Sequence, residues 1–139
     1  MNYHLVILKK LYLDAILAGR KTVESRFYQT NQKWLSQVSP GDKLFLKVTS
    51  GPVIATATID KVQIFNDLTP GKITELKNQF NDKILGDDQY WNQKQNSRFG
   101  ILIKLKDVQS ISPIFIKKFD WRAWVVLSKN DSFSLIDSL

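Results

Sequence analysis

The chain has 139 residues, a length typical of one domain around a single hydrophobic core. It contains no cysteine, which excludes disulfide bonds and thiolate metal sites. The formal net charge of +7 and the pI near 9.6 favour polyanionic partners such as nucleic acids. No signal peptide is evident, and no apolar run approaches the ~20 residues of a membrane span. We therefore expect a cytoplasmic protein with no membrane partner.

The first predicted elements are a strand and a short helix. Residues 4–8 are almost continuously apolar, which predicts a buried strand. A helix follows over about 10–18, because Leu13 and Ile16 recur at helical spacing. Gly19 is predicted to end it, since glycine tolerates the left-handed conformation found at many helix ends.

Residues 22–28 alternate as a strand, and three ionisable groups gather at its start. Glu24 and Arg26 lie on one face of this strand, and Lys21 lies on the turn that enters it. The surrounding sequence is basic: residues 1–50 carry eight Lys or Arg and three Asp or Glu, a net +5, whereas residues 51–139 carry twelve and ten, a net +2. The positive field is therefore strongest around this strand.

The middle of the chain predicts two more strands and two helices. Residues 43–48 and 53–65 alternate, and the small Ala55 and Ala57 suit the crowded inside of a small barrel. A helix over 70–84 begins with Thr69 as its N-cap and Pro70 in its first turn. A second short helix covers about 89–95. We interpret Asp87 and Asp88 as its caps rather than as metal ligands.

The last third predicts strands over 98–107, 108–116 and 121–127. The segment 108–116 contains Pro113, which is typical of an edge strand. Phe119 and Asp120 are predicted to form a turn, and 128–139 is a polar tail. In the segment between the second and third predicted strands, residues 29–39, we expect a loop with Trp34 packed on the core.

Several catalytic classes are disfavoured by the residue types present. The only histidine is His4, in a buried strand, so no Ser-His-Asp, Cys-His or HExxH arrangement is available. Phosphate-binding and dinucleotide-binding glycine loops are absent from the sequence as well. We expect His4 to be structural and predict no metal site and no cofactor.

The pattern Gly19, Lys21, Glu24 and Arg26, read as G-x-K-x-x-E-x-R after a helix, resembles the signature of the ASCH domain family, relatives of the PUA-like domains. Further blocks are similar to those of small bacterial ASCH proteins: residues 7–13, 40–47, 50–52, 87–94 and 122–127. The resemblance implies an α+β, mostly β fold, a PUA-like barrel of five to seven strands with flanking helices. It also implies an ASCH domain over 1–127 followed by a C-terminal tail, 128–139.

The resemblance implies binding of single-stranded RNA, or of a nucleobase or nucleotide, in a cleft at the barrel mouth. We expect Lys21, Glu24 and Arg26 to line this cleft. A buried carboxylate needs a cationic neighbour, so Arg26 is expected to pair with Glu24 and to leave Lys21 as the freer cation. Further ligand-binding candidates are Lys9, Lys10, Lys47, Tyr28 and Trp91. Other phosphate or stacking candidates are Arg20, Lys94, Trp34, Tyr90 and Trp121.

Two other functions stay open at this point. Some relatives are ribonucleases, and Lys21 and Glu24 are the candidate catalytic residues for such an activity. Other relatives are amidohydrolases of modified pyrimidine nucleosides with a K-x-x-T motif, whose threonine is replaced here by Glu24. A third class consists of protein-interaction domains. Affinity for nucleic acid should fall steeply with salt, whereas an apolar protein interface should respond far less.

Overall fold

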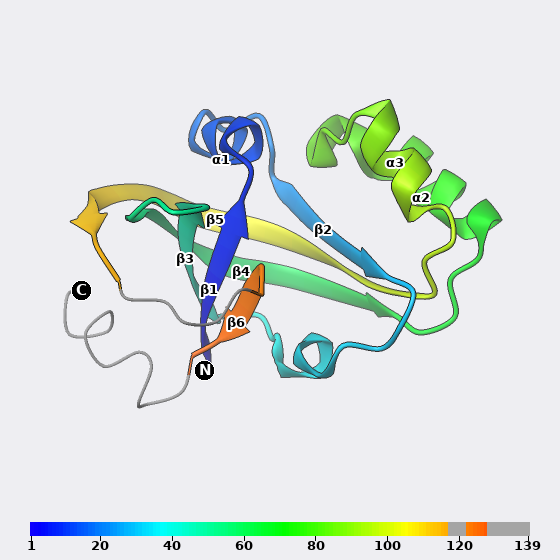
Figure 1. The fold of residues 1–139 in the computed structure, drawn as a ribbon, viewed down its shortest axis with the longest axis horizontal. Coiled ribbons are helices and arrows are strands. Elements are labelled where there is room, and N and C mark those ends of the chain that lie inside the picture. The colour runs from blue at the N-terminus through cyan, green and yellow to red at the C-terminus, as the bar shows by residue number, and fades with distance from the viewer. Residues whose placement is uncertain (117–121, 128–139) are drawn as a thin grey trace.

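The computed structural model describes residues 1–116 and 122–127, and in this part of the chain one curled sheet carries three α-helices and a 3₁₀ helix (Figure 1). None of these helices is long and apolar enough to cross a membrane. In chain order the elements are β1 (Tyr3–Leu8), α1 (Lys10–Leu17), β2 (Val23–Tyr28), η1 (Lys33–Gln37), β3 (Lys43–Val48), β4 (Val53–Phe65), α2 (Pro70–Ile84), α3 (Asp88–Lys94), β5 (Phe99–Ile114) and β6 (Trp124–Val126).

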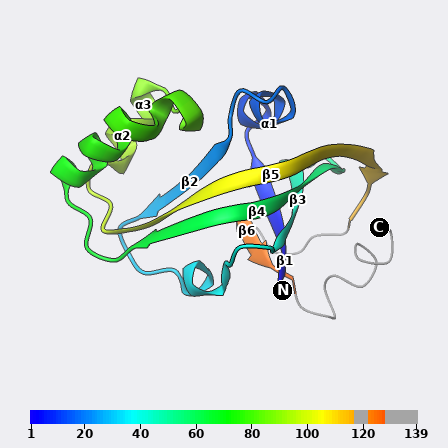
Figure 2. The same ribbon diagram turned by 180° about the vertical axis from the view of Figure 1, so that it is seen from behind.

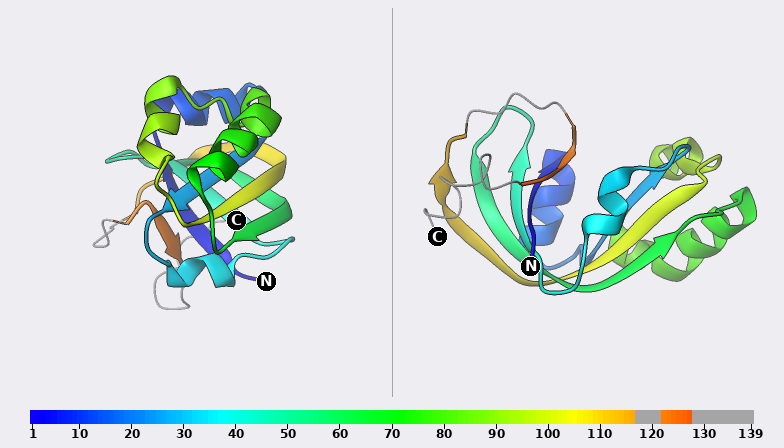
Figure 3. Two further views of the ribbon diagram at one scale, coloured as in Figure 1. Left: turned by 90° about the vertical axis from the view of Figure 1, so that its right-hand side faces the viewer. Right: turned by 90° about the horizontal axis from the view of Figure 1, so that it is seen from below.

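The sheet is a half-barrel with an open seam. Its six strands follow the order β2-β5-β4-β3-β1-β6, so β2 and β6 are its two edges. Only β1 and β3 run parallel; the other neighbours are antiparallel. The long strands β4 and β5 form the back wall (Figure 2), and the sheet curls so that β1 faces β2 across the opening (Figure 3). The predicted mostly β, five- to seven-stranded fold is confirmed.

The alternation of side chains gives three hydrophobic clusters: one on the concave face, one under α2 and α3, and a small third one of Leu5, Phe45, Val53 and Val125. The concave face holds Ala55, Ala57 and Ile59 together with Leu13 and Ile16 of α1. Helix α1 therefore covers one end of the half-barrel, and η1 lies at the opposite end (Figure 1). The outer face of β2 packs against α2 and α3; that second core contains Val23, Phe27, Ile73, Leu76 and Trp91. The small alanines fit the inside of the curl, as their size predicted.

The helix ends follow the local sequence. Gly19 has a φ of 78°, and its N–H donates to the Ile16 carbonyl, so α1 ends where glycine predicted. The Thr69 side chain accepts a hydrogen bond from Lys72 N at 3.2 Å and caps α2. Asp87 accepts from Tyr90 N at 2.7 Å and caps α3, which confirms a capping role for this aspartate. Trp34 is buried in the concave core, also as predicted.

Strand β5 differs from the prediction. It is one strand over Phe99–Ile114, not two strands that meet at Asp107. Asp107 has a φ of 51°, and the β4–β5 register shifts nearby, so the chain bulges and then resumes pairing with β4. Beyond Lys104 the strand has no β2 neighbour, which explains why it tolerates Pro113. The predicted 119–120 turn, the strand start at Trp121 and the 128–139 tail lie outside the described residues.

His4 forms a buried hydrogen-bonded chain that ties β1 to the start of β3 and to β6. Trp124 Nε1, which can only donate, lies 3.1 Å from His4 Nδ1, so the His4 proton is on Nε2 and is donated to Asp42 Oδ2 at 2.8 Å. Burial lowers the pKa of His4 below 6.5, although the Asp42 carboxylate opposes this shift. A second proton on Nδ1 would also displace the Trp124 donor.

This histidine should make the protein less stable in mild acid. Because the folded pKa lies below the unfolded value of 6.5, the unfolded chain binds the extra proton first as the pH falls. The free energy of unfolding should therefore decrease below pH 6.5, at up to about 1.4 kcal/mol per pH unit. Urea unfolding between pH 5 and 7 measures this slope. In His4→Gln the slope should flatten, and an unchanged slope would assign the effect to other groups.

Candidate functional site

A cleft of about 310 Å³ opens at the seam of the half-barrel, along the free edge of β2. Side chains from both faces of β2 line it, because Glu24, Arg26 and Tyr28 come from one face and Ser25 from the other. Its remaining walls come from the end of β1, α1, α3 and the residue before β6. They are lined by Ile7, Leu8, Lys9, Tyr12, Tyr90, Gln93, Lys94 and Ala123, and Phe27 of β2 is the last lining residue. We call this the seam cleft.

Glu24 is the electrostatic centre of the seam cleft. Its carboxylate lies 3.4 Å from Lys21 Nζ and 3.2 Å from Arg26 Nη2, and it accepts a hydrogen bond from Ser25 N at 2.9 Å. Burial alone would raise the pKa of Glu24, but Lys21, Arg26 and the Ser25 N–H together outweigh it and lower the pKa below its usual value. Glu24 is therefore an anion whose charge is already matched by its neighbours.

Lys21 has a different place from the one predicted. Its side chain is only 1% exposed, it is not among the residues that line the cleft, and its Nζ donates to the carbonyls of Val23 at 2.9 Å and Ile84 at 2.6 Å. Burial lowers the pKa of Lys21, and Glu24 partly offsets the effect. The prediction that Lys21 is the freer cation is wrong. Through these two buried hydrogen bonds, Lys21 links the start of β2 to the end of α2.

Arg26 is the cation of this group that reaches the cleft. Its Nη2 donates to the Ile7 carbonyl at 3.1 Å as well as to Glu24, and its guanidinium lies 5.4 Å from the centre of the Trp124 ring. Strands β2 and β1 are separated by three strands in the sheet, so this side chain bridges the seam directly. The guanidinium has five N–H groups, which leaves donors for a ligand.

Besides Arg26, the seam cleft is lined by two lysines and by three tyrosines: Lys9, Lys94, Tyr12, Tyr28 and Tyr90. Lys9, exposed, follows β1, and Lys94 ends α3 with its Nζ 5.6 Å from the centre of the Tyr90 ring. Burial, with Arg26 and Lys9 nearby, lowers the pKa of Lys94. The Tyr90 hydroxyl lies 2.6 Å from Ser25 Oγ, and burial raises the pKa of Tyr90. The wall thus presents positive charge and aromatic rings together.

Three other predicted residues lie away from the seam cleft. Lys10 is exposed and pairs with Asp14 at 2.7 Å on α1. Lys47 is buried on β3 and does not line the cleft. Trp91 is 1% exposed in the outer core, where its Nε1 donates to Asn81 Oδ1 at 2.9 Å; a base cannot stack on it in this arrangement. The neighbouring Tyr90 lines the cleft instead.

Sequence reasoning missed Tyr12 and Gln93. The available signal was helical spacing, because Gln93 and Lys94 lie three and four residues after Tyr90 and so share one face of α3. Tyr12 lies on α1 next to the buried Leu13, and its ring centre is 5.0 Å from Lys21 Nζ. Nothing in the local sequence indicated that α1 and α3 meet at the same cleft.

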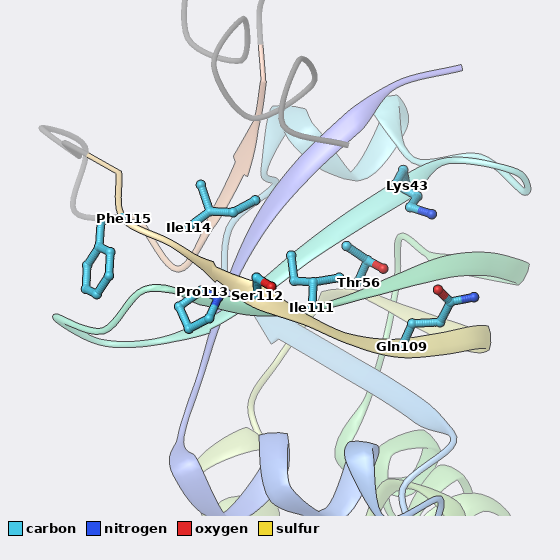
Figure 4. A pocket seen from close by; sticks show the side chains of 8 residues that line it. All are labelled: Lys43, Thr56, Gln109, Ile111, Ser112, Pro113, Ile114 and Phe115. Atoms are coloured by element: carbon cyan, nitrogen blue, oxygen red, sulfur yellow. The ribbon is translucent and has the colours of Figure 1, made fainter.

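A larger hollow of about 820 Å³ lies at the far end of β5 (Figure 4). Lys43 is the charged residue among those that line it, together with residues such as Thr56, Gln109 and the 83% exposed Phe115. It brings no cluster of ionisable groups together. Among residues 1–116 and 122–127, moreover, no three His, Asp or Glu side chains gather as metal ligands. The seam cleft is therefore the better candidate site.

Comparison with solved structures assigns the fold. ASCH from Zymomonas mobilis superposes with a TM-score of 0.72 at 16% identity, over 97% of this chain and 94% of that chain. A serine-to-alanine variant of the same protein gives 0.73 at 17% identity, over 98% and 95%. A hypothetical protein gives 0.52 at 17% identity, over 82% and 100%. No protein-family model and no curated protein matches the chain. The ASCH resemblance is confirmed at the level of the fold.

Proposed function

We propose that this chain, which has the fold of the ASCH proteins, binds single-stranded RNA or one of its nucleotides in the seam cleft. One observation carries the proposal: Lys9, Arg26 and Lys94 converge on a cleft whose only carboxylate among the described lining residues, that of Glu24, is already paired. The cleft therefore has surplus positive charge. The proposal includes a cytoplasmic location and an ASCH domain over 1–127 with 128–139 as a tail.

The lining suits the parts of a nucleotide. Lysine and arginine bind phosphate through charge-assisted hydrogen bonds. A tyrosine ring such as that of Tyr28 or Tyr90 offers a base a stacking surface, which is how many proteins bind single strands without reading their sequence. A volume of about 310 Å³ is at the lower end of the range for small-molecule pockets, so one nucleotide rather than a helix segment is the expected occupant.

Two adjacent lysines provide a matched test. Lys9 lines the cleft, whereas Lys10 is exposed and pairs with Asp14. Lys9→Ala should weaken binding of a labelled single-stranded RNA severalfold and should reduce the slope of log affinity against log salt by about one, because one phosphate contact is lost. Lys10→Ala should change neither. Fluorescence anisotropy at several salt concentrations measures both quantities.

Equal effects of the two variants would contradict the seam cleft as the binding site. RNA binding that does not respond to salt would contradict phosphate recognition altogether. Retained affinity for a protein partner at high salt would favour the alternative of an interaction domain. The same samples should be analysed for RNA cleavage and for nucleoside deacylation, which are the hydrolase alternatives.

The catalytic assignment of Lys21 and Glu24 receives little support from the geometry. Lys21 Nζ is held by two carbonyls and Glu24 and does not line the cleft. A carboxylate with a lowered pKa, like that of Glu24, is a weak general base. We therefore propose binding as the primary role. If turnover is found, the Ser25 and Tyr90 hydroxyls in the cleft are the first groups to replace.

A further inference from the structure

The backbone of β2 presents a regular set of groups to the seam. Leu105 N donates to Thr22 O, and the β2–β5 register continues from Val23 opposite Lys104 to Tyr28 opposite Phe99 without a shift. In an antiparallel pair, alternate residues exchange backbone hydrogen bonds with the partner strand. The even-numbered residues of β2 therefore bond to β5. The N–H and C=O groups of the odd-numbered residues point to the open edge.

Side chains of the protein already occupy the first part of this edge. Lys21 Nζ donates to the Val23 carbonyl at 2.9 Å. The Ser25 N–H donates to Glu24 Oε1 at 2.9 Å, and the Ser25 carbonyl accepts from the Tyr90 hydroxyl at 3.3 Å. Edge strands that are blocked by charged or polar side chains do not pair with another strand. This part of β2 is thus closed to ligands.

Phe27 is the odd-numbered residue of β2 whose N–H and C=O both have no hydrogen-bond partner among the described residues. The pairing of β2 with β5 uses the even-numbered residues and leaves the Phe27 N–H and C=O facing outward. No other hydrogen bond of the described residues involves these two groups. Phe27 as a whole residue is 2% exposed, and its side chain packs in the outer core against Trp91. Phe27 nevertheless lines the seam cleft, and the β2–β5 register directs its N–H and C=O to the strand edge along which the cleft runs.

Resting on the function proposed above, we infer that the main chain of Phe27 reads the Watson–Crick edge of an unpaired nucleobase. One residue of an edge strand offers a donor and an acceptor side by side. Each of the four common bases carries an acceptor next to a donor on its pairing edge, so this contact selects for a free edge and not for one base. A base-paired nucleotide, whose edge is occupied, is excluded. Arg26 and Lys94 in the same cleft then contact a carbonyl or the phosphate.

The test uses three ligands that share a phosphate: uridine 5′-monophosphate, its N3-methyl derivative and ribose 5-phosphate. Methylation of N3 removes the donor of the pairing edge and leaves the ring able to stack. The uridine nucleotide should bind at least tenfold more tightly than either of the others, by calorimetry. In a ¹⁵N spectrum the Phe27 amide should shift downfield on binding. The Ser25 amide on the same edge is the control and should not shift, since Glu24 already holds it.

The outcomes separate this inference from the function on which it rests. Equal affinity for all three ligands would overturn the role of Phe27 and leave phosphate and RNA binding standing. Tighter binding of the uridine nucleotide without a shift of the Phe27 amide would also overturn it. Absence of binding by all three ligands and by single-stranded RNA would overturn both.

Discussion

Lys21→Met should lower the free energy of unfolding by ~3–5 kcal/mol, the cost typical of breaking a buried ion pair from one side. The substitution keeps most of the side-chain volume and removes the ammonium group. It leaves the carbonyls of Val23 and Ile84 without their donor, and Glu24 keeps Arg26 as its one ion-pair partner. Urea unfolding of the variant and the parent protein, followed by circular dichroism, measures the difference.

Two controls distinguish this effect from a general loss of a lysine. Lys10→Met removes an exposed lysine that pairs with Asp14, and should change stability by less than about 1 kcal/mol. Glu24→Gln in the Lys21→Met background removes the poorly compensated anion and should recover part of the loss. If Lys21→Met unfolds at the same urea concentration as the parent protein, Lys21 is solvated and the buried arrangement is wrong. In that case its role as a ligand-facing cation would return.

The sequence predicted those features that depend on neighbouring residues. Gly19 ends α1 with a positive φ, and Thr69 caps α2, because both effects act within one helical turn. The alternation of 22–28 placed Glu24 and Arg26 on one face, and they do form an ion pair at 3.2 Å. Ala55 and Ala57 indicated the concave side of the sheet correctly. Patterns with a period of two or 3.6 residues were sufficient for each of these.

Features that depend on distant residues were not accessible in this way. Lys21 is buried because the Ile84 carbonyl, 63 residues away, meets its Nζ. Tyr90 reaches the cleft through Ser25, 65 residues earlier, while the adjacent Trp91 turns into the outer core. Strand β5 continues through Asp107 because β4 supplies a partner on both sides of the bulge. In each case the sequence shows a side chain's identity, and the partner that decides its role is set by tertiary packing.

Arg26→Ala should reduce the affinity for single-stranded RNA by at least tenfold and lower the free energy of unfolding by ~1–3 kcal/mol. The side chain performs three tasks: it pairs with Glu24, it donates to the Ile7 carbonyl across the seam, and it supplies positive charge to the cleft. Anisotropy at fixed salt gives the affinity, and urea unfolding gives the stability. Arg20→Ala is the matched control, since Arg20 is an exposed arginine six residues earlier.

Arg26→Lys separates charge from geometry. A lysine keeps the positive charge, but its single ammonium group lacks the planar fork that reaches Glu24 and Ile7 together and lies over the Trp124 ring. If the fork holds the two sides of the seam at the right separation, Arg26→Lys should bind RNA nearly as poorly as Arg26→Ala while keeping the salt slope of the parent protein. Affinity equal to the parent would mean that the cleft needs only net charge. The bridge across the seam would then serve stability alone, and ligand binding would not depend on the width of the cleft.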